Sequence, residues 1–248
     1  MLVAPASPVT AAVQLLAAAT QWKAESAGPA AYSKFAIPVS PTSPKQIPSR
    51  QAMTIIYAPA FAAAAAALAT SPAINGREAL VAGMLTAHFA KRLVEVFFVH
   101  RYSGLAGRAL SAGIGSYYAL TVLLITSMQR GVESYAPRLP LYALALYFAG
   151  QLGNFAHHVS LARQRDASSK YLVPKGLFFD FATMPHYAFE IVAWLGVALA
   201  SGEAHAFLVA ASMASYLGGR AVATTRWYEK KFGAAWPADR WHMVPGVF

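Results

Sequence analysis

The sequence predicts an all-α, polytopic membrane protein, a bundle of about six transmembrane helices, and three observations indicate this fold class. Of the 248 residues, 57% are hydrophobic and only 12% are charged, whereas an average soluble domain is about 45–50% apolar and about 25% charged. The apolar residues form long runs, and most basic residues lie between these runs on one side. This composition therefore disfavours an ordinary cytosolic enzyme. The absence of cysteine also excludes a disulfide framework and a thiolate metal site.

Six apolar runs are near the length of about 20 residues that a helix needs to cross a hydrocarbon core. They cover approximately residues 52–70, 79–100, 109–128, 140–157, 177–200 and 205–224. Residues 9–21 are also apolar but too short to span, so we expect an interfacial helix or one that packs against a partner. Turn-forming pairs such as Asn75-Gly76 and Ser201-Gly202 separate the runs.

The basic residues predict the orientation of the chain. If the loops alternate between two sides, one side holds only Arg77, Arg130 and Arg138, and the other holds nearly all remaining loop lysines and arginines. This positive-inside asymmetry predicts that both termini face the cytoplasm, or the matrix of an organelle. Topology and contact with anionic membrane lipids then explain the net charge of +10, and we expect no nucleic-acid partner.

Residues 1–50 differ from the remainder of the chain, because they are rich in proline, serine and alanine and contain one acid, Glu25. We therefore divide the chain into an N-terminal arm (1–50), with its short apolar helix, and a membrane domain (51–248) whose cofactor site lies within 150–248. The arm has the composition of an organellar transit peptide, but it lacks arginine before Arg50. We expect the arm to offer contacts to protein partners.

Ionisable side chains inside the predicted spans are candidate site residues, because each costs roughly 2.5–3.5 kcal/mol at the centre of a membrane helix. Lys91 and Arg92 precede Glu95 by four and three residues, so both can pair with it on one helical face. The alternatives are interfacial ion pairs, polar contacts between helices and a basic membrane anchor. The clusters are His88, Lys91, Arg92 and Glu95; Gln151, Asn154, His157 and His158; Asp180, His186, Tyr187 and Glu190; and Arg220, Thr224, Arg226, Tyr228, Lys230 and Lys231.

The fifth span carries the strongest of these signals. We expect Pro185 to kink its helix, and we expect Arg220 to be the partner of its carboxylates, Asp180 and Glu190. The clusters place cationic groups at the cytoplasmic ends of several helices, which suits a ligand with phosphates, such as a nucleotide cofactor or an acyl-CoA. No GxGxxG or P-loop motif occurs in its required context. Seven scattered histidines do not form the closely spaced boxes of a di-iron enzyme, so we expect no metal.

Several segments resemble those of known membrane reductases. The runs KRLVEVFFVHRYS (91–103), QLGNF (151–155), PHYAFE (185–190) and WLG (194–196) look like the signature of very-long-chain trans-2-enoyl-CoA reductases. The tail from Arg220 to Pro245 resembles the C-terminal block of the wider steroid 5α-reductase family, the 3-oxo-5α-steroid 4-dehydrogenase C-terminal domain. This resemblance covers approximately residues 50–248 and is densest after residue 150.

The resemblance implies an integral membrane oxidoreductase of lipid metabolism in the endoplasmic reticulum, or in an organellar inner membrane. It implies that NADPH reduces a conjugated C=C bond in a lipid such as a trans-2-enoyl-CoA, as in fatty-acid elongation. Tyr187 would donate the proton to the enolate, with Lys91 lowering its pKa, so these two would be catalytic. The implied cofactor contacts are Asn154, Arg165, Tyr171, His186, Glu190, Arg220 and Tyr228.

The sequence departs from this family at a few positions. The family has a Glu on its first conserved span, whereas the matching positions here fall near Ile55-Ile56, and Phe89 replaces a Tyr of the steroid reductases. These changes disfavour a steroid substrate. Together with His158 and His186, they leave open a catalytically weak or silent reductase-fold subunit of a larger membrane complex. A methyltransferase using S-adenosylmethionine is disfavoured, because the fifth span lacks an Arg-His-Pro run.

Overall fold

The computed structural model describes residues 8–36, 45–71, 76–129, 141–165 and 171–248, which are mostly helical, as the sequence predicts. The α-helices are α1 (Pro8–Ala27), α2 (Ser49–Ala69), α3 (Arg77–Val94), α4 (Arg108–Met128), α5 (Leu141–Gln164), α6 (Pro185–Ser201) and α7 (Ala204–Phe232). The short elements are the 3₁₀ helices η1 (Ser33–Phe35), η3 (Leu177–Asp180) and η4 (Gly233–Ala235), the π-helix η2 (Glu95–Val99), and the strands β1 (Gln46–Pro48) and β2 (Leu105–Gly107).

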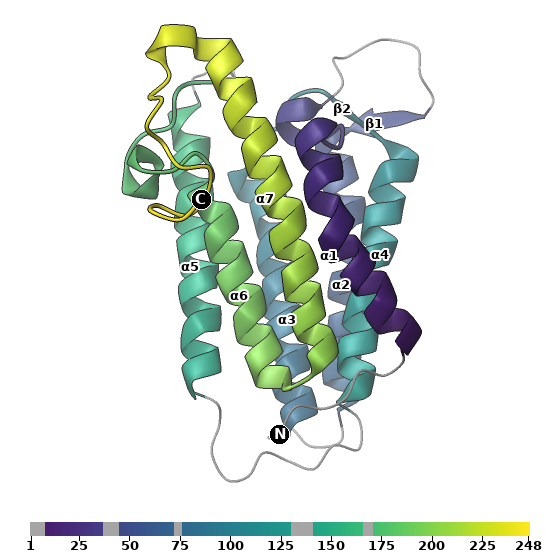
Figure 1. Cartoon of the computed structure of the whole chain (residues 1–248). Helices are drawn as coiled ribbons and strands as arrows, with labels where there is room; N and C mark the ends of the chain where they lie inside the picture. Colours follow the sequence, from purple (N-terminus) through teal and green to yellow (C-terminus); the bar gives the residue numbers. More distant parts are fainter. Residues whose placement is uncertain (1–7, 37–44, 72–75, 130–140, 166–170) are drawn as a thin grey trace.

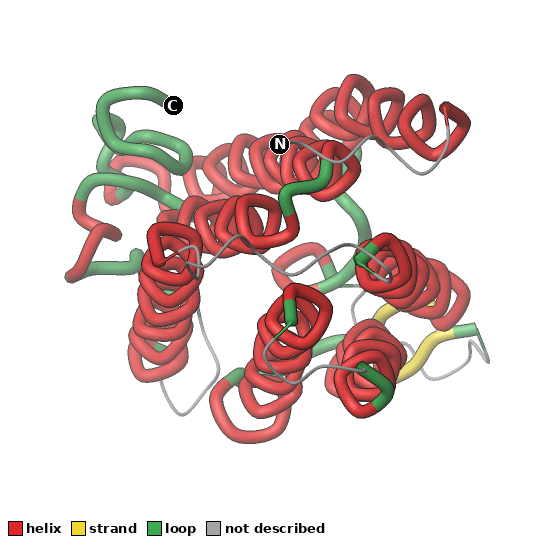
Figure 2. The backbone as a smooth tube through the Cα atoms, turned by 90° about the horizontal axis from the view of Figure 1, so that it is seen from below, coloured by secondary structure: helices red, strands yellow, loops and turns green. Residues whose placement is uncertain are grey.

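The α-helices form a bundle in which α5 packs along α6, α1 packs along α7, and α2 packs against both α3 and α4 (Figures 1 and 2). Strand β1 pairs with β2 in antiparallel orientation, with Ile47 opposite Ala106. This ribbon and the C-terminal segment lie at the same end of the bundle (Figure 1). We call it the ribbon end, and the candidate site lies between the helices there.

Glycines allow two of these helix pairs to pack closely. A Cβ atom at Gly150 of α5 would lie 2.4 Å from the backbone nitrogen of Ala193 in α6. A Cβ atom at Gly219 of α7 would lie 2.5 Å from the carbonyl oxygen of Trp22 in α1. Small residues at helix interfaces let backbones approach closely in membranes. The N-terminal helix is therefore packed directly against the last helix of the bundle.

Within the described residues, three helices are long and apolar enough to cross a membrane: Ser49–Ala69, Arg108–Met128 and the segment Ala204–Ala235. A helical membrane protein is thus supported. The prediction of six spans, and of the side on which each terminus lies, stays a prediction. Arg130 and Arg138, which contribute to the predicted orientation, lie outside the described residues.

The fifth predicted span begins later than expected. Helix α6 starts at Pro185, at the first helical position, where the missing N–H of proline would have no partner in the helix anyway. Pro185 therefore begins the helix, and the prediction that it kinks the helix is wrong. Asp180 lies before α6, in η3, where its carboxylate accepts a hydrogen bond from the Gly176 backbone N–H at 3.0 Å.

The apolar segment predicted at residues 9–21 is longer in the structure, because α1 covers 20 residues and ends at Ala27. Its partner is α7 of the same chain, and the backbone N–H of Trp22 donates to the Ser215 hydroxyl of α7 at 2.9 Å. Glu25, near the end of α1, is only 5% exposed. The N-terminal arm thus brings a buried carboxylate into the bundle.

The second predicted span ends in the π-helix η2. The backbone N–H of His100 donates to the Glu95 carbonyl at 2.8 Å, which is the wider i to i+5 turn of a π-helix. This turn directs Glu95 (0% exposed) into the bundle and leaves Phe98 83% exposed. Single π turns inside helices are frequent at functional sites.

Candidate active site

A cavity of about 1540 Å³, including the space open to solvent at its mouth, lies among these helices. Its lining residues come from the N-terminal arm and from α2 to α7. Every predicted cofactor residue lines it, as does the predicted catalytic Tyr187. These cofactor residues are Asn154, Arg165, Tyr171, His186, Glu190, Arg220 and Tyr228.

One end of the cavity is cationic. Lys34, Arg101 and Arg165 line it, and among the described residues no carboxylate lies within ion-pair distance of any of them. We call these three residues the cationic end. Arg101 donates to the Arg165 carbonyl at 3.0 Å, and the Arg165 guanidinium lies 4.3 Å from the centre of the Tyr171 ring. These cations therefore face the cavity without an anionic partner in the described part of the chain.

Lys34 belongs to η1 in the N-terminal arm. Its Nζ lies 4.7 Å from the centre of the Tyr228 ring and 3.8 Å from the Met184 sulfur. Burial, together with the positive charges of Arg165 and Arg220, lowers the pKa of Lys34 to about 7. Because an anion beside it would restore its charge, Lys34 is suited to bind phosphate.

Arg220 is buried at 2% exposure, and its partners come from the N-terminal arm. Its Nη1 donates to the Glu25 carboxylate, its Nη2 donates to the Tyr32 carbonyl at 2.8 Å, and its guanidinium lies 3.9 Å from the centre of the Tyr32 ring. The prediction that Arg220 is the partner of Asp180 or Glu190 is therefore wrong. The prediction considered only acids of the membrane domain as partners of Arg220, whereas the partner is Glu25, the single acid of the arm.

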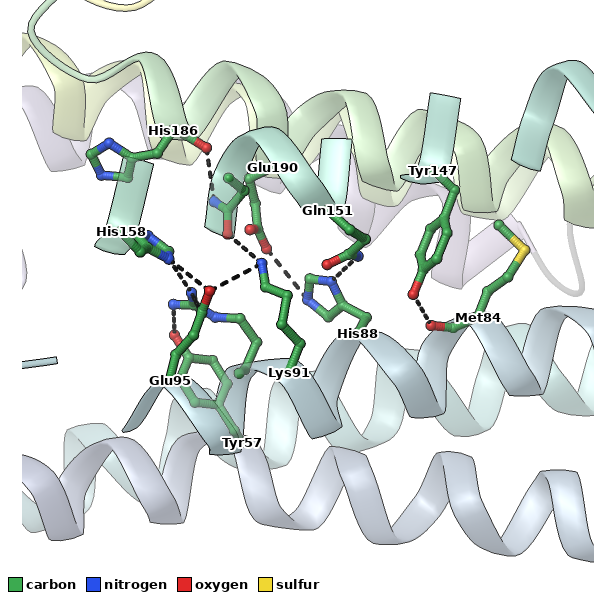
Figure 3. Close-up of polar contacts among 12 residues, drawn as sticks. Tyr57, Met84, His88, Lys91, Glu95, Tyr147, Gln151, His158, His186 and Glu190 are labelled. Atoms are coloured by element: carbon green, nitrogen blue, oxygen red, sulfur yellow. Dashed lines mark hydrogen bonds and ion pairs between the residues drawn. The ribbon is translucent and has the colours of Figure 1, made fainter. Parts of the chain in front are cut away.

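Two carboxylates inside the bundle, those of Glu95 and Glu190, contact basic side chains of α3 (Figure 3). His88 Nε2 lies 3.3 Å from Glu190 Oε1, and Lys91 Nζ lies 3.3 Å from Glu95 Oε1. Arg92 Nη1 lies 2.5 Å from Glu95 Oε2, so the predicted pairing of Lys91 and Arg92 with Glu95 is confirmed. We call His88, Lys91, Arg92, Glu95 and Glu190 the paired network.

The two predicted catalytic residues occupy different surroundings. Tyr187 lines the cavity, and the charge that acts most strongly on its phenol is that of Arg220. Lys91 is not among the residues that line the cavity. It donates to Asn154 Oδ1, and the Asn154 side-chain amide donates to the His186 carbonyl at 2.9 Å. Lys91 is therefore linked to the cavity through Asn154. The cation that acts on Tyr187 is Arg220 and not Lys91.

Three potential metal-ligand atoms, from Glu95, His100 and His158, lie within 4.8 Å of one another. Histidine boxes in the sequence do not reveal this group, because only the π turn brings Glu95 and His100 together. The Glu95 carboxylate is already in contact with Lys91 and Arg92, and Arg92 Nη1 lies 3.2 Å from His158 Nδ1. These two cations oppose a metal ion electrostatically, so the geometry favours an ion-pair cluster.

Sequence reasoning missed the contribution of the arm and of α2. Lys34, Tyr32 and Phe35 line the cavity from η1 and the residue before it, and Met53 and Tyr57 line it from α2. A tyrosine, a lysine and a phenylalanine within four residues of a proline-rich arm were the available signal. Ile56 is buried in the core at 3% exposure, and Ile55 is 36% exposed. Neither isoleucine lines the cavity.

Comparison with known proteins gives one family. The sequence profile of 3-oxo-5-alpha-steroid 4-dehydrogenase matches residues 109–248, which is more than half of the chain. A very-long-chain enoyl-CoA reductase of Dictyostelium discoideum is 29% identical over 64% of this chain and 54% of its own length. Polyprenal reductase 1 of Arabidopsis thaliana is 26% identical over 70% of this chain and 66% of its own length.

A third relative aligns from end to end. The 3-oxo-5-alpha-steroid 4-dehydrogenase 2 of Macaca fascicularis is 27% identical over 98% of this chain and 97% of its own length. By contrast, the chain spans about half the length of other curated relatives that it matches, such as 54% of the D. discoideum protein and 42% of a putative enoyl-CoA reductase of Trypanosoma brucei brucei. All four names describe reductases or dehydrogenases.

Proposed function

Because the chain belongs to the 3-oxo-5-alpha-steroid 4-dehydrogenase family, we propose that it is a membrane-bound reductase that uses NADPH to saturate a conjugated C=C bond in a lipid. One observation carries this proposal: the cofactor residues carried over from the family, although far apart in the sequence, all line one cavity together with Tyr187. A silent accessory subunit would have no need of so complete a cavity. The proposed compartment is the endoplasmic reticulum.

The cavity fits the phosphates of a dinucleotide cofactor. Lys34, Arg101 and Arg165 face it without carboxylate partners in the described part of the chain, and arginine binds phosphate with two parallel hydrogen bonds. Tyr171 and Tyr228 add aromatic faces beside these cations. We assign the phosphates to this end of the cavity. When bound, the reduced nicotinamide supplies the hydride.

The proposed substrate is an acyl thioester, a trans-2-enoyl-CoA or a similar lipid. Met53, Phe89 and Met213 line the cavity with apolar surface, which suits an acyl chain. Hydride addition at the β-carbon leaves negative charge on the carbonyl oxygen, and we assign the proton for the α-carbon to Tyr187. Lys91 is assigned a positioning role, because it holds Asn154 at the cavity wall.

The direct test is NADPH oxidation by the purified full chain in detergent. A long trans-2-enoyl-CoA, a polyprenal and a 3-oxo-4-ene steroid are offered in parallel, and we expect turnover of the enoyl-CoA. Tyr187→Phe should abolish turnover while NADPH still binds, since the phenol is assigned to protonation and not to the cofactor. Tyr142→Phe changes a phenol on the exposed surface of α5 (64% exposed) and should leave activity unchanged.

Two results would contradict the proposal. One is the absence of NADPH binding at millimolar cofactor, and the other is binding without turnover of any of the three substrates. Turnover of the steroid or the polyprenal alone would support the proposed reductase activity and contradict the proposed enoyl-CoA substrate.

A further inference from the structure

We infer that Tyr57 is a second catalytic residue, the hydrogen-bond donor to the substrate carbonyl oxygen, and that Arg92 and Glu95 position it. The inference rests on the proposed reductase function and names the group that stabilises the enolate. The resemblance to the family assigned this residue no role. Tyr187 and Tyr57 then have separate roles, one at the α-carbon and one at the oxygen.

The first observation is the position of the side chain. Helix α2 directs Met53 and Tyr57 toward the cavity, and Tyr57 is only 7% exposed. Its ring stacks on Tyr118 with centroids 6.1 Å apart and is tilted against Phe89 at 6.5 Å. Tyr57 is thus a polar group held in the aromatic part of the cavity wall, on a different helix from Tyr187.

The second observation is its hydrogen bonding. Arg92 Nη2 donates to the Tyr57 phenol oxygen at 2.6 Å (Figure 3). Guanidinium has no acceptor, so the phenol cannot donate back to it. No described residue accepts a hydrogen bond from the Tyr57 hydroxyl. The phenol therefore has a proton available for a ligand, while its oxygen is held by a cation.

The third observation is that Arg92 itself is fixed. Its Nη1 lies 2.5 Å from Glu95 Oε2, and Glu95 is fully buried and also bonded to His158 at 3.0 Å. The guanidinium lies 4.8 Å from the centre of the Tyr57 ring. Arg92 is held from both sides, so the phenol oxygen that it binds is held as well. Preorganised donors of this kind stabilise developing charge without reorganisation.

The chemistry requires such a donor. The reduced nicotinamide, when bound, would supply a hydride with its electron pair for the β-carbon. The π electrons of the C=C bond would then move toward the carbonyl, whose oxygen becomes an enolate oxygen. The Tyr57 hydroxyl donates a hydrogen bond to that oxygen and keeps its proton. The α-carbon takes its proton from Tyr187, which recovers one from solvent. The sum is one hydride and one proton added across the double bond.

The primary test measures the carbonyl directly, without turnover. A long trans-2-enoyl-CoA that is isotope-labelled at its carbonyl carbon is bound to the full chain with oxidised cofactor, and its C=O stretch is recorded by difference infrared spectroscopy. We expect a stretch at lower frequency than in detergent alone. Tyr57→Phe should return the stretch toward the free value. Tyr147→Phe is the matched control, because this buried phenol donates to the Met84 carbonyl at 2.6 Å and does not line the cavity.

A second measurement separates the role in catalysis from a role in folding. Loss of one donor to a developing oxyanion typically costs 10²–10³-fold in kcat, so Tyr57→Phe should lower kcat by about 100-fold with NADPH affinity unchanged. Should Tyr57→Phe fail to fold, a fluorinated tyrosine at position 57 keeps the hydroxyl as a stronger donor. It should lower the C=O frequency further and move the alkaline limb of the pH–rate profile to lower pH.

The outcomes are distinct. If the wild-type chain reduces none of the conjugated substrates, the proposed function fails before any variant is made. If the wild-type chain is active and Tyr57→Phe binds the enoyl-CoA with its lowered C=O frequency intact, the assignment of Tyr57 is overturned. A change of equal size in Tyr147→Phe would also overturn it, since the effect would then be structural.

Discussion

The cationic end lines the cavity and the paired network reaches it through His88, Arg92 and Glu190, but the charges of the two regions are balanced in opposite ways. In the paired network every carboxylate has a basic partner on α3, as in the contacts of His88 with Glu190 and of Arg92 with Glu95. At the cationic end, Lys34, Arg101 and Arg165 have no carboxylate partner among the described residues. Ion pairs within the protein hold side chains in place. Cations that lack a carboxylate partner among the described residues are available to bind an anionic ligand. The two regions should therefore respond differently to mutation.

Removing the central acid of the paired network should have the largest effect. Glu95→Ala leaves Lys91 and Arg92 without the carboxylate that both contact, and breaking a buried ion pair from one side costs about 3–5 kcal/mol. The free energy of unfolding in detergent should fall by that amount, or the chain should fail to fold. Glu229→Ala, at an exposed position of α7, should change it by less than about 0.5 kcal/mol. Equal stability of the two variants would contradict the structural role of the network.

Removing a charge of the cationic end should reduce binding and leave stability unchanged. A hydrogen bond to a charged group contributes about 1.5–3 kcal/mol, so Arg165→Ala should weaken NADPH binding by roughly 10- to 100-fold. Calorimetric titration measures the affinity, and thermal unfolding without cofactor measures the stability. Arg163→Ala removes an exposed charge two residues earlier on α5 and serves as the matched control. Unfolding of Arg165→Ala at a lower temperature would show that this arginine belongs with the structural charges.

The sequence predicted the paired network better than the cationic end, for a physical reason. Lys91, Arg92 and Glu95 lie within one helical turn, and turn spacing alone determines that they can pair. Lys34 and Glu25 lie in an arm outside the predicted spans, so their places depend on the packing of α1 against α7. The membrane helices were predicted from long apolar runs. The start of α6 was not predicted correctly, because Phe178, Phe179 and Phe181 continue the apolar pattern through η3, before the helix begins at Pro185.

The smallest predicted effect, the pH dependence of cofactor binding, separates Lys34 from the other cations. The pKa of Lys34 without ligand is about 7, and a bound phosphate would raise it, so binding takes up a proton when the pH is above 7. Affinity should therefore be highest below pH 7 and should fall by up to about tenfold for each pH unit above it. The fall should be absent in Lys34→Ala, whose remaining pH dependence reports the cofactor phosphate itself. Lys45→Ala, which removes an exposed lysine, should keep the wild-type profile. If Lys34→Ala and the wild-type chain gave the same pH profile, Lys34 would be excluded from the phosphate site. The role of the arm would then be to pack against α7 and to bind Arg220.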